Sequence, residues 1–199
     1  MPYINHYCYR SPIGSFLSLT KEEWLAQMKA RHPQTTSHTL TDPGIKAWEN
    51  CFDVLQATFS QLPERYRRLQ VIFEYVLPYY PPDHLRSGND PGVRADVVIL
   101  GKKDLVILEF KQRDEVLPMF MRQARKYRNR LQKHHIQSAG MNKKSVLVLT
   151  KGHDIRLHDY RLEICSPEHL ASVLQQLLGP APGRKTKTEV RDWLCSEYK

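Results

Sequence analysis

Two short apolar runs, residues 95–100 and 105–110, are separated only by the polar tetrapeptide Gly-Lys-Lys-Asp at 101–104. Runs of this length, rich in valine, isoleucine and leucine and joined by a short turn, are typical of a β-hairpin. If Lys102 and Lys103 form the tip of the turn, residues whose numbers sum to 205 face each other. Because side chains alternate along a strand, this register fixes which residues share a face.

The predicted register brings charged side chains together at one end of the hairpin. Asp96 is expected directly opposite Glu109, and Lys111 follows on the same face. Opposed residues have Cβ atoms about 5 Å apart, so two such carboxylates repel each other unless a cation lies between them. The other face is apolar and is expected to enter the core; it carries Val97, Ile99, Val106, Leu108 and Phe110.

This pattern favours hydrolysis of a phosphodiester bond. Mg²⁺ binds one or two carboxylates, keeps several waters and contacts phosphate oxygens, so Mg²⁺ or Mn²⁺ is the expected cofactor. Its expected ligands are Asp96, Glu109 and the backbone carbonyl of Phe110, and a metal there lowers the pKa of a bound water. Lys111 is expected to orient that water or help to deprotonate it. The competing interpretation is two solvated charges on an exposed hairpin face.

The rest of the chain predicts an α/β fold with a mixed sheet and helices on both faces. Helices are expected at 20–31, 44–61, 114–135, 166–178 and 188–198, and further strands near 7–9 and at 69–77, 145–150 and 162–165. The first helix begins with a capping box, Thr20-Lys-Glu-Glu23. The expected organisation is an N-terminal extension with one helix (1–42), a core (43–179), and a basic linker with a short helical segment (180–199).

The residues Asp96, Glu109 and Lys111 resemble the D-x(n)-(D/E)-x-K signature of the PD-(D/E)XK nuclease superfamily. The expected order of elements is similar to that superfamily's α-β-β-β-α-β core, the restriction-endonuclease-like fold. The residue before Asp96 is Ala95 instead of proline, at a position that varies widely in the superfamily. The resemblance implies a metal-dependent deoxyribonuclease with little sequence preference.

A second motif resembles the RecB-like branch of the superfamily. Gln123 and Tyr127 match its Q-x-x-x-Y pattern, in which both side chains contact substrate or steady the active site. The resemblance also implies a further catalytic acid upstream. Glu74 interrupts an apolar strand, where a charge needs a reason, whereas Glu49 lies on the preceding helix, where an exposed role is expected. Glu74 is therefore favoured, with Glu49 as the alternative.

A narrower resemblance covers nearly the whole chain. Residues 73–78, 96–98, 108–111 and 192–198 are similar to the N-terminal region of certain bacterial helicases, whose chains continue into a P-loop ATPase. This sequence contains no GxxxxGK[ST] motif. The resemblance implies a helicase or ATPase domain as a partner, and a role in DNA processing or, by analogy, phage defence.

The charge of the chain points to a polyanionic partner. The net charge is +9 and the sequence pI about 9.4, a balance that favours nucleic acid, with DNA first and RNA open. The expected track for a phosphate backbone is the helix at 114–135, through Arg122, Arg125, Lys126 and Arg130 beside Gln123 and Tyr127. His134 and His135, at its end, are expected on the solvated surface. Residues 183–187 are expected to form a flexible linker.

Other classes of protein fit the sequence less well. The four cysteines are far apart and form no CxxC or Cys/His cluster, so neither a zinc site nor a disulfide framework is indicated. There is no apolar run long enough for a membrane span and no signal-peptide pattern, so a cytoplasmic location without a membrane partner is expected. Two alternatives to an active nuclease remain: a non-catalytic nucleic-acid-binding module, and a domain that cuts only with its helicase partner.

Overall fold

The computed structural model describes residues 6–35, 39–77 and 93–196. Its centre is a seven-stranded mixed sheet in the order β1-β2-β3-β4-β5-β7-β6. The strands are β1 (Tyr9–Pro12), β2 (Gln70–Leu77), β3 (Val93–Leu100), β4 (Asp104–Lys111), β5 (Asn142–Leu149), β6 (Arg156–Asp159) and β7 (Leu162–Cys165). The helices are α1 (Ile13–Leu17), α2 (Lys21–Thr35), α3 (Asp42–Ser60), α4 (Pro118–His134), α5 (Pro167–Leu178) and α6 (Lys187–Leu194), with short 3₁₀ turns η1 (Glu64–Arg68) and η3 (Ile136–Ser138).

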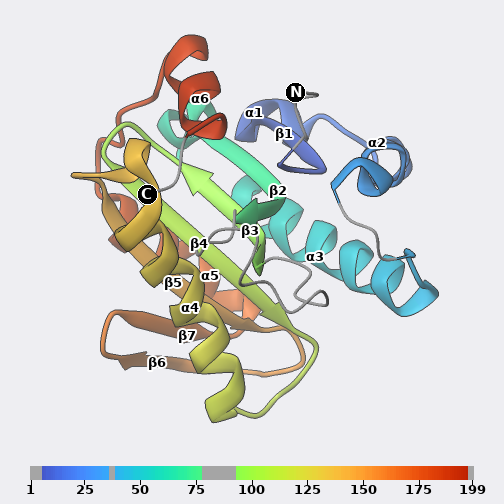
Figure 1. Ribbon diagram of the computed structural model, residues 1–199. Coiled ribbons are helices and arrows are strands. Elements are labelled where there is room, and N and C mark those ends of the chain that lie inside the picture. The colour runs from blue at the N-terminus through green and yellow to red at the C-terminus, as the bar shows by residue number, and fades with distance from the viewer. Residues whose placement is uncertain (1–5, 36–38, 78–92, 197–199) are drawn as a thin grey trace, which may run out of the picture.

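The sheet changes direction between its two halves. Strands β1 to β4 are antiparallel neighbours, whereas β5 runs parallel to β4 and β7 runs parallel to β5. Helix α4 is the crossover between β4 and β5, and it covers one face of the sheet while α3 and α5 cover the other (Figure 1). The predicted α/β architecture, a mixed sheet with helices on both faces, is therefore confirmed.

The hairpin of β3 and β4 has the predicted register. Its paired residues run from Val97 with Leu108 to Leu100 with Leu105, and each pair of numbers sums to 205. The apolar face packs under α3 and α5, as expected, and the alternate residues pack under α4 and α6. The backbone ladder ends at Val97, one residue before the predicted pair of Asp96 and Glu109. There the Asp96 carboxylate, instead of a backbone carbonyl, accepts the amide hydrogen of Phe110.

Several element boundaries differ from the predicted ones for local reasons. Helix α4 begins at Pro118, which occupies its first turn, so residues 114–117 precede the helix. The capping box at Thr20 is present: Glu23 accepts from the Thr20 amide, and Thr20 Oγ1 accepts from the Glu23 amide. Strand β6 was missed because its residues are mostly exposed and polar. No helix in the described part of the chain is long and apolar enough to cross a membrane.

The end of α4 corrects a second prediction. His135 follows the last residue of α4 and is only 3% exposed, not on the solvated surface. Its Nδ1 lies 2.7 Å from Ser138 Oγ, and its Nε2 lies 3.3 Å from the Tyr75 hydroxyl. Trp193 of α6 packs on its ring and donates to Ser138 Oγ. The C-terminal helix thus docks on the face of the sheet that α4 covers.

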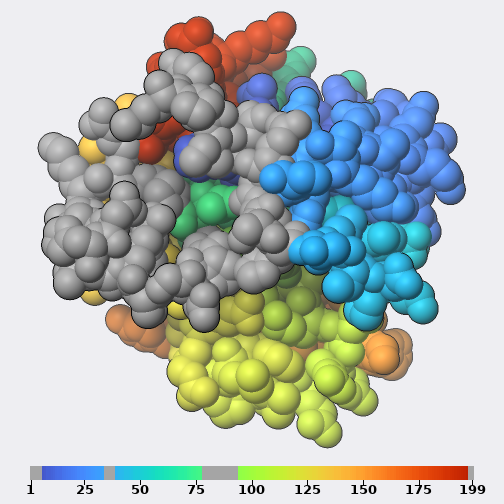
Figure 2. All heavy atoms as spheres, turned by 45° about the vertical axis from the view of Figure 1, so that its right-hand side comes forward, coloured from blue at the N-terminus to red at the C-terminus, as the bar shows by residue number. Residues whose placement is uncertain are grey.

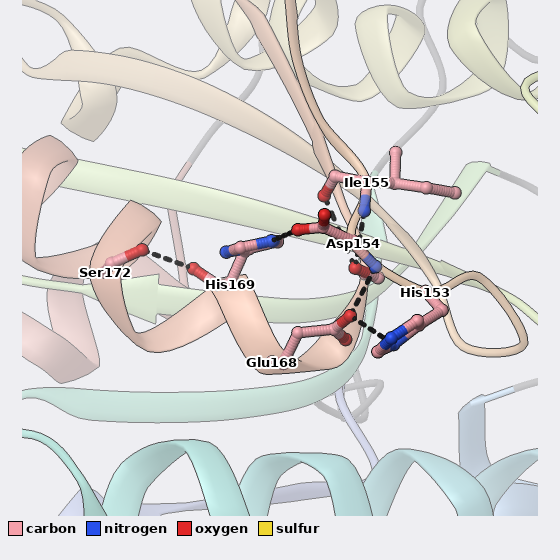
Figure 3. Close-up of polar contacts among 7 residues, drawn as sticks. His153, Asp154, Ile155, Glu168, His169 and Ser172 are labelled. Atoms are coloured by element: carbon pink, nitrogen blue, oxygen red, sulfur yellow. Dashed lines mark hydrogen bonds and ion pairs between the residues drawn. The ribbon is translucent and has the colours of Figure 1, made fainter.

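A polar cluster anchors the loop between β5 and β6. The Asp154 amide donates to Glu168 Oε1 at 2.5 Å, and His169 Nε2 lies 2.9 Å from Asp154 Oδ1 (Figure 3). The Ile155 amide donates to Ser166 Oγ. These contacts tie the loop to the first turn of α5, where a carboxylate such as Glu168 is favourably placed. They stabilise the sheet edge on which β6 pairs with β7.

Candidate active site

A cleft of about 510 Å³ lies where β2, β3 and β4 meet α2 and α3. Figure 2 shows α2 and α3 in blue along one side and, below them, the yellow-green atoms of the segment that joins β4 to α4. The predicted residues that line this cleft are Glu74, Asp96, Glu109, Phe110, Lys111 and Gln123. The alternative acid, Glu49, does not line it. The fold thus brings together residues that are up to 49 positions apart in the sequence.

Glu74 interrupts the pairing of β2 with β3. The ladder pairs Phe73 with Val97 and Tyr75 with Ala95 but omits Glu74, whose φ is +53°. A side chain at this φ is strained by about 1–2 kcal/mol, so other contacts must hold it. Its Oε1 accepts from Trp48 Nε1 at 3.0 Å, and its Oε2 pairs with an arginine, described next.

Arg94 is a partner of Glu74 that the sequence did not reveal. Its Nη1 lies 3.1 Å from Glu74 Oε2, and both side chains are largely buried. The predicted register would have placed Arg94 opposite Lys111, but the β3–β4 ladder ends before that point. Burial raises the pKa of Glu74, and the Arg94 charge and the Trp48 hydrogen bond act against this rise. Glu74 therefore lies in the cleft with a cation of its own.

Asp96 is fixed by the backbone of the neighbouring strand. Its Oδ2 accepts from the Phe110 amide at 2.7 Å. The Thr150 amide donates to the Lys111 carbonyl, so Lys111 turns its backbone groups toward β5. Successive residues of a strand alternate, and the carbonyl of Phe110 therefore points to the same side as its amide, toward Asp96. This is the orientation that the predicted metal-binding role of that carbonyl requires.

Glu109 is fully buried and pairs with Lys111. Lys111 Nζ lies 2.6 Å from Glu109 Oε1, and it also lies over the ring of Phe120 at 5.4 Å from the centroid. The second oxygen, Oε2, is buried and makes no hydrogen bond of standard geometry with the described residues, although the Tyr127 hydroxyl lies close enough to the carboxylate to interact with it. A buried carboxylate oxygen without a donor is costly, so Oε2 is a position where a cation or water would be favourable.

The electrostatics of the cleft also favour a cation. Burial raises the pKa of Asp96 well above its usual range, and the charges of Glu109 and Glu74 raise it further. Burial likewise raises the pKa of Glu109, although Lys111 opposes this. Three carboxylates share the cleft, and the cations paired with them among the described residues are Lys111 and Arg94, so the ionised carboxylates repel one another. A divalent cation would lower all three pKa values at once.

The donor set fits a hard cation better than a softer metal. Within the described residues, no group of three or more His, Cys, Asp or Glu side chains is arranged to hold a metal ion. The candidate ligands are therefore Asp96, Oε2 of Glu109 and the Phe110 carbonyl, with water and substrate oxygens completing the shell. Mg²⁺ is commonly bound in this way, through one or two carboxylates and several waters.

Gln123 lines the cleft from α4, and Tyr127 lies one helical turn further along the same helix. Gln123 Nε2 donates to the Tyr127 hydroxyl at 2.6 Å. Tyr127 is only 3% exposed, so it cannot serve as the nucleic-acid contact that was predicted. Burial raises its pKa strongly, and the nearby charges of Glu109 and Asp96 raise it further. We therefore assign Tyr127 a positioning role next to Glu109.

The predicted basic residues of α4 gather in one hollow. A depression of about 470 Å³ is lined by Arg122, Arg125, Lys126, Arg130, Asn129, Lys133 and His134. Arg122 and Lys126 are exposed, whereas Arg125 is bound to Asp159 at 2.6 Å. Lys126 and Arg130 follow Gln123 by one and two helical turns, so they continue along the helix from the cleft. The hollow retains most of its positive charge for an anionic ligand.

Comparison with protein-family models and with curated proteins finds no match to this chain. Its function therefore has to be argued from the chemistry of the cleft.

Proposed function

We propose that this chain is a divalent-metal-dependent nuclease of the PD-(D/E)XK type that hydrolyses DNA phosphodiester bonds with little sequence preference. The observation that carries the proposal is the pairing in one cleft of half-buried Asp96 with fully buried Glu109. Lys111 lies beside Glu109, and Oε2 of Glu109 makes no hydrogen bond of standard geometry with the described residues. When bound there, Mg²⁺ or Mn²⁺ would supply an acidified water and charge neutralisation at the phosphate.

Each residue of the cleft and of α4 would have its own role in the reaction. Asp96 and Glu109 would hold the cation, and the Phe110 amide keeps the Asp96 carboxylate in place. Lys111 Nζ, now paired with Glu109 Oε1, would orient the attacking water and stabilise the negative charge that develops on the phosphate. Lys126 and Arg130 would contact phosphates next to the scissile one, without reading bases. Glu74 would set the shape and charge of the cleft through Trp48 and Arg94.

The proposal is tested by cleavage of supercoiled plasmid and of linear single-stranded DNA, with Mg²⁺, with Mn²⁺ and with EDTA. Lys111→Ala should abolish metal-dependent cutting. Lys103→Ala is the matched control, because Lys103 is an exposed lysine at the opposite end of β4. Nicked or shortened products would separate endonuclease from exonuclease activity.

One alternative rests on the basic hollow of α4, which needs no metal to bind a polyanion. In that case the chain binds DNA in EDTA but cuts nothing with either metal. If cutting appears only after a helicase or ATPase partner is added, the chain is the nuclease part of a larger assembly. In either case Lys111→Ala leaves binding in EDTA unchanged, which separates the site of cutting from the site of binding.

A further inference from the structure

A second basic surface lies at the other end of the sheet from the cleft. A groove of about 890 Å³ runs between β1, α1, η1 and the segment that leads into α6. Its lining includes six cationic side chains, Arg10, Arg67, Arg68, Arg184, Lys185 and Lys187, and no described carboxylate. An adjoining hollow shares Arg68 and Arg184 and adds Arg65 together with one carboxylate, Glu64. We call this surface the η1–α6 groove.

The walls of the groove are held in place by hydrogen bonds and by one close contact. The Lys102 amide donates to the Gly183 carbonyl at 2.7 Å, and the Tyr66 hydroxyl donates to the Gly179 carbonyl. A Cβ at Gly14 would lie 3.3 Å from Arg67 Cβ, so glycine lets α1 approach η1 closely. The segment 179–186 is thus attached to the fold, although residues 183–187 were predicted to form a flexible linker.

Two acids lie close in sequence to the cations of this surface, Glu64 at the adjoining hollow and Glu189 at the start of α6, and Glu189 is already engaged. Glu189 accepts from the Thr186 amide at 2.6 Å, and Thr186 Oγ1 accepts from the Glu189 amide, which completes a capping box at the start of α6. Arg67, Arg68, Arg184 and Lys187 are exposed, with no ion pair found for them among the described residues. Concentrated positive charge of this kind repels itself, and an anionic ligand removes that cost.

The groove is separate from the cleft. Gln70 lines the groove and Glu74 lines the cleft, and they are four residues apart on β2, or roughly 13 Å along the strand. Figure 1 shows α6 and α1 together at one end of the sheet. A nucleic-acid strand carries a phosphate at every nucleotide, so a strand bound in the cleft can extend beyond it.

The shape and composition favour nucleic acid over a lipid surface. The large exposed apolar side chains of the described residues are Met119, Ile136, Leu157 and Tyr160, and none of them lines the groove. Peripheral membrane binding combines basic charge with inserted apolar groups. A concave channel with arginines on both walls instead suits a phosphate backbone, because Arg binds phosphate oxygens in a bidentate manner.

We propose that the η1–α6 groove binds the phosphate backbone of nucleic acid, as a contact surface distinct from the cleft and from α4. This extends the proposed function, because it gives the same class of substrate a second point of attachment. It does not depend on catalysis, since the groove contains no catalytic residue. Binding at both surfaces would increase affinity by linking two weak contacts on one ligand.

The test is fluorescence anisotropy of a labelled single strand of about 20 nucleotides, bound to the intact chain in EDTA. Arg184→Glu/Lys187→Glu changes one wall, and Arg68→Glu changes the other. For the double variant we expect binding to weaken by about 10-fold or more and the salt slope to fall by about 2. Arg68→Glu should weaken binding in the same direction. Lys29→Glu/Lys151→Glu is the control with the same charge change at exposed sites elsewhere.

The outcomes separate this proposal from the nuclease proposal. Equal affinities of the groove and control variants would overturn the groove proposal, whether or not the chain cuts DNA. Conversely, absent cleavage with a groove-specific loss of binding would leave the groove proposal supported and the nuclease proposal refuted for the isolated chain. Parallel titrations use single-stranded RNA and phosphatidylserine-rich vesicles. Stronger, groove-dependent binding to vesicles than to either nucleic acid would overturn the proposal in favour of a membrane surface.

Discussion

Lys111 Nζ lies 2.6 Å from Oε1 of Glu109, while Oε2 of the same carboxylate is buried without a described hydrogen-bond partner. One oxygen is thus paired with a cation of the chain, and the Tyr127 hydroxyl is a further polar neighbour of the same carboxylate. Two side chains at positions i and i+2 of a strand share a face, which is why the spacing Glu-x-Lys produces this arrangement.

Replacing Glu109 with glutamine should lower cleavage activity without lowering the stability of the fold. Cleavage should fall by about 100-fold or more, because the metal loses a charged ligand. The midpoint of thermal unfolding should stay the same or rise, because a neutral amide removes repulsion with Asp96 and Glu74. Exposed Glu22→Gln is the control. A lower midpoint with unchanged cleavage would make the Glu109–Lys111 pair a structural ion pair only.

Removing the Tyr127 hydroxyl should weaken metal binding without changing the binding of DNA. Tyr127→Phe loses the hydrogen bond from Gln123 and a polar group beside Glu109. Changes next to metal ligands cost about 10-fold to 100-fold in metal affinity or activity. We therefore expect a higher Mg²⁺ concentration at half-maximal cleavage, with unchanged oligonucleotide binding in EDTA. Tyr160→Phe, at an exposed tyrosine, should change neither quantity; an unshifted Mg²⁺ midpoint in Tyr127→Phe would argue against its positioning role.

The backbone at Glu74 allows a prediction about stability alone. At most strand positions, a chain with glycine is less stable than the same chain with alanine by roughly 0.5–1 kcal/mol. At Glu74, with φ +53°, the order should reverse, because alanine is strained there by about 1–2 kcal/mol and glycine is not. Urea unfolding of Glu74→Gly and Glu74→Ala measures this, since both lose the Trp48 and Arg94 contacts. The same pair of changes at Val76, on the same strand, should keep the ordinary order.

The hairpin was predictable because its information is local. Alternating side chains and a short turn fix the faces of β3 and β4, and these place Asp96, Glu109 and Lys111 at one end. The partners of Glu74 were not predictable in this way. Trp48 reaches it from α3, 26 residues earlier, and the positive φ at Glu74 has no signature in the sequence.

His135 shows how a local pattern can mislead. Its neighbours on α4 are basic and exposed, which predicts a solvated histidine. Tyr75 from β2 and Trp193 from α6 cover it instead, and both lie about 60 residues away in the sequence. Strand β6 was missed for a related reason, since its polar residues acquire strand structure only through pairing with β7.

The buried His135 should make the fold less stable in acid. Burial, assisted by the charge of Lys143, lowers its pKa from 6.5 to about 4. The folded chain therefore keeps His135 neutral where the unfolded chain binds a proton, so stability is complete above about pH 6.5 and is lost as the pH falls toward 4. One pH unit is worth at most about 1.4 kcal/mol, and the unfolded histidine is only half protonated at pH 6.5, so the free energy of unfolding should fall by about 1.5 kcal/mol between pH 6.5 and 5. Urea unfolding at several pH values measures this fall, which His135→Gln should flatten. Equal slopes for the wild-type chain and His135→Gln would mean that other groups cause the acid sensitivity.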